Sequence, residues 1–144
     1  MAAVPKALPD RTVTGEGFVV EPTIESRRQR RFILVTSDPA FRASVEETIP
    51  KDWSMQVVTD LAEAGEWSDI LLHRFIILDS DDPGIDAVDT VVRLRTDLML
   101  QVAVFSFGGS VAQRDELRLA RADRFYERSQ VGQVLPQFFA QYAW

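Results

Sequence analysis

The chain has 144 residues, a length typical of one domain with a self-sufficient hydrophobic core. Its net charge of -6 opposes the positive surface that nucleic-acid binding requires, so a nucleic-acid partner is not expected. The lack of cysteine excludes disulfides, thiolate metal ligands and cysteine nucleophiles. The sequence has neither the apolar centre of a signal peptide nor an apolar run near the ~20 residues of a membrane span. We therefore expect a cytoplasmic protein without membrane contact.

Residues 1–30 are predicted to form an N-terminal arm, and residues 31–144 the folded domain. The arm is rich in proline and glycine and poor in apolar side chains. Within it, Phe18–Val20 alone has the composition of an edge strand. The arginine-rich run at residues 27–31 is interpreted as a solvated segment that keeps a sheet edge from aggregating, with a patch for nucleic acid or an acidic partner as the alternative.

A buried strand and an amphipathic helix open the predicted domain. Phe32–Val35 is continuously apolar, as expected for a strand whose sheet is covered on both faces. Asp38 is predicted to cap the following helix, and Pro39 fits its first turn, where a missing N–H costs nothing. Apolar residues at helical spacing continue to Ile49. Met55–Val58 then predicts a second, shorter strand.

The next segment is predicted to be a helix from Leu61 to about Leu72, capped by Asp60. His73, the only histidine, follows this helix. Because no second histidine or cysteine is present to share a metal, we expect His73 in a surface loop and not as a ligand.

The apolar run Phe75–Leu78 predicts the next buried strand, which leads directly into Asp79. In a doubly wound parallel sheet, ligands and reactions lie outside the carboxyl ends of the strands. Asp79 is therefore a candidate nucleophile. Pro83 and Gly84 turn the chain before the helical pattern resumes.

The helix after this turn is predicted to bury an apolar face and to expose its arginines. Its sheet-facing positions are Val88, Val91, Val92 and Leu94, and its outward positions are Arg93 and Arg95. Leu100–Phe105 then predicts a fourth strand, which ends at Ser106.

Two further helices and a weak strand complete the pattern. Ser110 and Gln113 have capping-box spacing at the start of the first of these helices. Three arginines at i, i+4 and i+7 form one basic stripe on it: Arg114, Arg118 and Arg121. Arg124–Glu127 predicts a weak fifth strand. The last helix has the clearest apolar face, and Pro136 within it predicts a kink or a late start: Val131, Val134, Leu135, Phe138, Phe139 and Tyr142.

Five strands that alternate with five helices through short connections predict a parallel sheet with right-handed crossovers and helices on both faces. The expected fold is therefore α/β, a flavodoxin-like three-layer sandwich whose five-stranded sheet has the strand order 2-1-3-4-5.

From Phe32 onward the chain resembles the receiver domain of two-component response regulators. Leu78–Asp86 is similar to the phosphoacceptor block of that family, with Asp79 in the place of the acceptor and a Pro-Gly pair after it. Ser106 falls where the family has its switching serine or threonine. The resemblance implies the flavodoxin-like fold and a role in phosphorelay signal transduction.

Ala122–Arg128 resembles the family's block that carries a switch aromatic, here Phe125, and an invariant lysine. The lysine is replaced by Arg128. We consider two interpretations of Arg128: a bidentate pair with Asp79 that stands in for both metal and lysine, or a surface arginine at a strand end.

The acidic pair that binds magnesium in the family is replaced by Thr36 and Ser37. Magnesium prefers hard oxygen ligands that include carboxylates, so these hydroxyls should weaken its binding severely. Asp38 lies one residue out of phase, and we interpret it first as a helix cap. We therefore expect no cofactor, with Asp38, Asp79 and Asp81 as weak candidate magnesium ligands.

These departures predict a stand-alone, atypical receiver, a pseudo-receiver without enzymatic activity, in which phosphorylation of Asp79 is impaired or absent. The resemblance implies an interaction face on the fourth helix, fifth strand and fifth helix. Residues expected on this face are Arg114, Arg118, Arg121, Phe125 and Tyr126, although a solvated helix face also explains the arginines. A histidine kinase or a downstream regulator is the implied kind of protein partner, and a homodimer is a further option.

Three alternatives remain at this point. An intact phosphorelay receiver requires Asp38 and Asp81 to rebuild a magnesium site around Asp79. A phosphatase of the haloacid-dehalogenase type is suggested by Asp79-Ser80-Asp81, but that chemistry needs a downstream lysine and the chain has none after Lys51. Residues 27–31 as a nucleic-acid arm form the third alternative.

Overall fold

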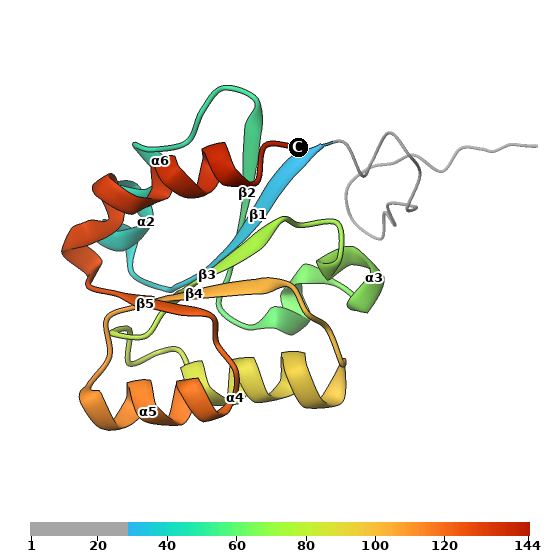
Figure 1. Cartoon of the computed structure of the whole chain (residues 1–144), viewed down its shortest axis with the longest axis vertical. Helices are drawn as coiled ribbons and strands as arrows, with labels where there is room; N and C mark the ends of the chain where they lie inside the picture. Colours follow the sequence, from blue (N-terminus) through green and yellow to red (C-terminus); the bar gives the residue numbers. More distant parts are fainter. Residues whose placement is uncertain (1–28) are drawn as a thin grey trace, which may run out of the picture.

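The computed structural model describes residues 29–144, which form a five-stranded sheet between two helical layers (Figure 1). The elements follow in the order β1 Arg30–Val35, α2 Pro39–Glu46, β2 Trp53–Val58, η1 Leu61–Ala64, α3 Trp67–Ile70, β3 Phe75–Asp79, α4 Ala87–Val92, η2 Arg93–Asp97, β4 Ala103–Phe107, α5 Val111–Leu119, β5 Arg124–Tyr126, η3 Arg128–Gln130 and α6 Val131–Gln141. The expected arm lies almost wholly outside the described residues, as does its candidate edge strand Phe18–Val20.

All strand pairs are parallel, and the sheet has the order β2-β1-β3-β4-β5, which confirms the flavodoxin-like prediction. Val35 lies opposite both Val58 and Leu78, and Leu78 lies opposite Ser106. This register brings the carboxyl ends of β1, β3 and β4 together at one edge of the sheet. Loops that follow these three strands therefore share a common site.

Alternate side chains of each strand enter two different cores. Phe32 and Phe75 pack with α2 and α6 in an aromatic layer, in which Phe105 and Phe138 stack with ring centroids 4.1 Å apart. The neighbouring side chains, such as Ile76, enter an aliphatic layer with α4 and α5. Because both faces of the sheet are covered, the strands are continuously apolar, as the sequence predicted. Within residues 29–144, no helix has the combination of length and apolar character that a membrane crossing needs.

Three strand predictions were wrong by two or more residues at an end. β2 begins at Trp53, ahead of the predicted Met55. β1 begins at Arg30, ahead of the predicted Phe32, and therefore includes part of the arginine-rich run. β4 covers Ala103–Phe107 instead of Leu100–Phe105, so Ser106 lies within the strand and not after it.

The predicted long helix at residues 61–72 is also wrong. A short 3-10 helix, η1, starts after Asp60, whose side chain accepts a hydrogen bond from the Ala62 N–H at 2.9 Å, and Gly65 ends it with φ +106°. A Cβ at Gly65 would lie only 2.3 Å from the Asp69 carboxylate. The one-turn helix α3 follows, so the segment breaks where only glycine fits.

His73 is buried, not part of a surface loop as predicted, with 8% of its area exposed. Its Nδ1 lies 3.0 Å from the carbonyl oxygen of Asp69, which identifies Nδ1 as the protonated nitrogen of the neutral ring. Burial lowers the pKa of His73, because the imidazolium form loses its hydration.

Arg95 was predicted to point outward but is 5% exposed. Its Nη1 donates to the carbonyl oxygens of Leu100 and Val102, both at 2.8 Å, and its Nε donates to that of Arg121 at 3.1 Å. Nη2 contacts Asp123 at 2.9 Å. One guanidinium therefore satisfies the backbone of two loops, and it explains why residues 100–102 are not strand.

Replacing Arg95 with Met should lower the free energy of unfolding by about 1–3 kcal/mol, because buried carbonyl groups would lose their donor. Arg93→Met is the matched control on the neighbouring position, where the side chain is about half exposed. We expect the control to change stability by no more than about 0.5 kcal/mol. Urea unfolding measures both, and equal values for the two variants would contradict the role of Arg95.

Candidate functional site

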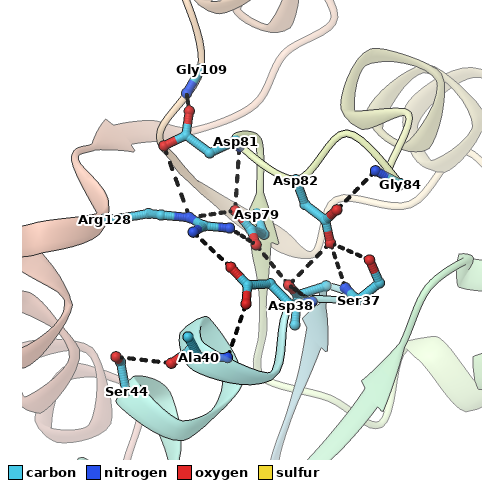
Figure 2. A network of polar contacts seen from close by, with 11 residues as sticks. Ser37, Asp38, Ala40, Ser44, Asp79, Asp81, Asp82, Gly84, Gly109 and Arg128 are labelled. Carbon is cyan, nitrogen blue, oxygen red and sulfur yellow. Dashed lines mark hydrogen bonds and ion pairs between the residues drawn. The ribbon is translucent and has the colours of Figure 1, made fainter.

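Asp79 ends β3 and is fully buried at the carboxyl edge of the sheet. Its Oδ1 accepts from Arg128 Nε at 3.0 Å, and its Oδ2 accepts from Arg128 Nη2 at 2.5 Å (Figure 2). Thr36 Oγ1 donates to the same Oδ2 at 2.6 Å. The bidentate pair expected as one interpretation of Arg128 is therefore present, and both carboxylate oxygens have donors.

Arg128 contacts two further carboxylates and one ring. Nη1 donates to Asp38 Oδ2 at 2.9 Å, and Nε lies 3.9 Å from Asp81 Oδ2. The guanidinium carbon is 4.9 Å from the ring centroid of Phe41. Burial acts to lower the pKa of Arg128, but the hydrogen bonds and charges of Asp79 and Asp38 outweigh it, so the pKa is raised. The guanidinium is a fixed positive charge at the centre of this site.

Thr36 and Ser37 occupy the places of the expected acidic pair and act as hydrogen-bond donors. The backbone N–H and the hydroxyl of Ser37 both donate to Asp82 Oδ2 at 2.6 Å, and Gly84 N–H donates to Asp82 Oδ1 at 2.8 Å. Burial acts to raise the pKa of Asp82, but the donors from Ser37, Gly84 and Thr36 outweigh it, so the pKa is lowered. Asp82 is therefore held as an anion by neutral groups.

Asp38 caps α2, as interpreted from the sequence, and also contacts Arg128, which the sequence analysis did not predict. One of its carboxylate oxygens caps α2 by accepting from Ala40 N–H at 2.9 Å, and the other accepts from Arg128. The hydrogen bond from Ala40, followed by that from Arg128, lowers the pKa of Asp38.

Ser106 is fully buried, and its hydroxyl lies 2.6 Å from that of Ser80. The sequence analysis singled out Ser106 but gave Ser80 no role, although Ser80 directly follows Asp79. Asp81 was considered as a weak metal candidate and as part of a phosphatase motif, yet its Oδ1 accepts from Gly109 N–H at 2.8 Å. Gly108 has φ +87°, and a Cβ there would lie 2.3 Å from the Asp81 carboxyl carbon. The Gly108-Gly109 pair is thus the sequence feature that could have indicated the contact between this loop and Asp81.

The expected interaction face is divided between two surfaces. Arg121 was predicted on the helical stripe, but α5 ends at Leu119 and Arg121 has φ +78°. Arg118 lies with its guanidinium carbon 4.9 Å from the Phe125 ring centroid. Tyr126 packs on the opposite sheet face, with centroid distances of 5.4 Å to Phe107 and 5.6 Å to Phe138.

The arginines of α5 also have contacts within the domain, which a fully solvated stripe would lack. Arg114 Nη2 contacts Glu127 at 2.5 Å and its Nε donates to the Gly108 carbonyl oxygen at 3.2 Å, while Arg118 contacts Asp115 at 2.8 Å. Each charge therefore already has an acidic neighbour, and exposed pairs of this kind contribute little stability.

Among residues 29–144, no group of three or more histidine or acidic side chains has an arrangement that could hold a metal ion. The guanidinium of Arg128 lies among Asp38, Asp79 and Asp81, which are the three candidates from the sequence. Because these carboxylates surround a cation of the protein itself, they do not fit a divalent ion in this arrangement.

No family model and no curated protein matches the chain. Solved structures do match it, including a receiver domain from Bermanella marisrubri at 21% identity and TM-score 0.63, covering 78% of this chain and 96% of that one. The phosphorylated cyanobacterial phytochrome response regulator RcpA matches at 16% identity and TM-score 0.62, covering 79% and 94%. The response regulator domain of Thermotoga maritima CheB matches at 17% identity and TM-score 0.59, covering 78% and 92%. The chain therefore has the fold of a response-regulator receiver domain.

Replacing Arg128 with Met should lower the free energy of unfolding by about 3–5 kcal/mol, because the buried Asp79 carboxylate would lose its counter-charge. Adding Asp79→Asn should recover part of this loss, with a coupling above about 1 kcal/mol in a double-mutant cycle followed by urea unfolding. Arg42→Met, on the exposed face of α2, is the control. A loss at Arg128 no larger than that of the control would contradict the interpretation.

Proposed function

We propose that this chain is a signalling module of the receiver type that acts by binding a protein partner, and that phosphorylation of Asp79 is impaired or absent. The observation that carries the proposal is the bidentate contact of Arg128 with Asp79. The likeness of the fold to receiver domains supports the signalling role. The departures at Thr36, Ser37 and Arg128 support the atypical character.

A magnesium ion would compete with Arg128 for the Asp79 carboxylate. A magnesium ion that bound Asp79 would have to displace a guanidinium that is covalently part of the chain. The two anionic ligands that would favour the ion are replaced by Thr36 and Ser37, whose hydroxyls already donate to Asp79 and Asp82. Magnesium demands near-octahedral oxygen ligation, so this site offers it little compensation.

The charge of the product also opposes phosphorylation. A phosphoryl group on Asp79 carries about -1.5 to -2 charges where the carboxylate carries -1, so up to about one negative charge is added next to Asp81 and Asp82. One unit charge ~4 Å from another costs ~4 kcal/mol at an effective dielectric near 20. Arg128 is already engaged with Asp38 and Asp79, so it adds no new compensation. A penalty of this size reduces phosphorylation by more than about a hundredfold.

A signal would also have to pass from Asp79 to the surface of the domain. In the receiver family the switching hydroxyl and aromatic respond to the phosphoryl group, and their counterparts here are Ser106 and Phe125. Ser106 is engaged with Ser80, and Phe125 lies beneath Arg118. We propose that these contacts hold the module in one state, so that recognition depends on its surface and not on modification.

We place the partner on the surface of α5 and β5 formed by Arg118, Leu119 and Phe125. Leu119 is among the most exposed large apolar side chains of the described residues, and arginine beside aromatic groups is enriched in interface hot spots. Acidic residues on the partner fit this surface. A histidine kinase or a downstream regulator is the kind of partner that the fold suggests. We propose that the chain itself is a non-enzymatic protein of the cytoplasm.

Incubation with acetyl phosphate and magnesium should leave the intact mass of the chain unchanged. The variant Thr36→Asp, Ser37→Asp, Arg128→Lys restores the residue types of a receiver site, and it should gain the mass of one phosphoryl group. A stoichiometric adduct on the natural chain that disappears in Asp79→Asn would refute the impaired chemistry and favour an intact phosphorelay.

Charge reversal at Arg118 and Arg121 together should abolish capture of a partner by the tagged chain, because the two acidic replacements would repel the partner's acidic residues. Arg42→Glu, an exposed arginine on the opposite helical layer, should leave the capture unchanged. If the double variant keeps its urea stability and still retains the partner, α5 is not the binding surface.

A further inference from the structure

The amino edge of the sheet carries an apolar groove that the proposed function does not use. It is a pocket of about 410 Å³, lined by Trp67, Ser68, Leu71, Leu72, His73, Arg74 and Trp144. This volume lies within the ~300–1,000 Å³ that ligand pockets commonly have. Three of its lining side chains are unusually exposed for their type: Trp67 at 55%, Leu71 at 49% and Trp144 at 76%.

The apolar surface extends beyond this pocket. Trp67 also lines a second hollow of about 240 Å³ between α3 and η2, where Leu98 is exposed as well. Trp67 therefore joins two hollows into one continuous surface. Contiguous exposed apolar surface of this kind marks an interaction site more often than scattered single residues do.

Positive charge borders the groove on the side of β1. Arg74 lies 4.0 Å from the ring centroid of Trp144, and its backbone N–H donates to the carbonyl oxygen of Arg31 at 2.7 Å. The charge of Arg30 adds to burial in lowering the pKa of Arg74, and that of Arg31 adds to burial in lowering the pKa of His73. The groove is therefore apolar at its centre and bordered by arginines at this rim, of which Arg30 also pairs with Asp52, in a chain whose net charge is -6.

The chain itself contains a segment of complementary chemistry. Residues 16–21 read Glu-Gly-Phe-Val-Val-Glu, three consecutive apolar side chains between two acidic ones. This segment lies outside the described residues. Phe18 supplies a large apolar group for the groove, and Glu16 and Glu21 match the charge of its rim.

The covalent connection favours this segment over a separate partner. The chain enters β1 at Arg30, beside Arg74 on the wall of the groove. About ten residues separate Val20 from Arg30, and they span up to ~33 Å when extended, which is ample for a neighbouring groove. A short tether of this kind gives an effective concentration of about millimolar, so even weak contacts become populated.

We propose that residues 16–21 bind in the groove formed by Trp67, Leu71 and Trp144, as an intramolecular peptide ligand. Phe18 and its apolar neighbours occupy the pocket, and Glu16 and Glu21 face the arginines at the start of β1. The groove is therefore a docking surface for this segment, separate from α5.

The absence of cysteine from the chain makes disulfide trapping a direct test. In the full chain, Val19→Cys is combined with Leu71→Cys, and the rate of intramolecular disulfide formation under mild oxidation is measured by intact mass. Val19→Cys with Leu119→Cys is the matched control, because Leu119 is 86% exposed and lies outside the groove. Random collision would favour this more exposed position.

We expect the pair at Leu71 to close on the order of tenfold faster than the pair at Leu119, because binding raises the local concentration of the two thiols. Glu16→Lys with Glu21→Lys should bring the rate at Leu71 down towards the control. Equal rates for the two pairs would overturn the proposal. Disulfide-linked dimers in place of the intramolecular product would also overturn it, in favour of a second copy of the chain in the groove.

Discussion

The ion pair between Asp79 and Arg128 is the interaction on which the carboxyl edge of the sheet depends. A fully buried carboxylate is expensive unless a counter-charge and hydrogen bonds compensate for its lost hydration. In this chain the counter-charge is a side chain, which cannot dissociate as a metal ion does. Because the same guanidinium also contacts Asp38, it connects β3, the start of α2 and the start of η3. The site is therefore a structural junction as well as a candidate functional centre.

The guanidinium of Arg128 as counter-charge explains which polar residues surround it. Arginine offers a planar set of donors that matches two carboxylate oxygens, whereas lysine is a compact point charge and magnesium needs several anionic oxygens. Once the guanidinium fills this role, hydroxyls suffice at Thr36 and Ser37, where they donate to carboxylates without adding negative charge. The guanidinium of Arg128 and the hydroxyls of Thr36 and Ser37 thus act together as donors to the buried carboxylates.

The sequence was sufficient for the sheet order and the position of Asp79, because continuously apolar strands and short connections leave few alternatives. It was not sufficient where one side chain serves the backbone of a distant segment. Arg95 looked like a solvated helix residue, and nothing local indicates that it donates to the carbonyl oxygens that follow η2. The sequence also did not predict the break at Gly65 or the contact of Asp81 with the Gly108 loop, because each depends on the conformation of a single glycine.

The two edges of the sheet differ in how far their side chains are already engaged by other groups. At the carboxyl edge, Asp79 and Ser106 are both engaged by other side chains, so a modification there must first break existing contacts. At the amino edge, Trp67 and Trp144 expose apolar area that no contact within the described domain removes from water. Burying that area on a peptide releases free energy at about 25 cal/mol per Å². Occupation of the amino edge therefore disturbs fewer existing contacts than modification of Asp79 would.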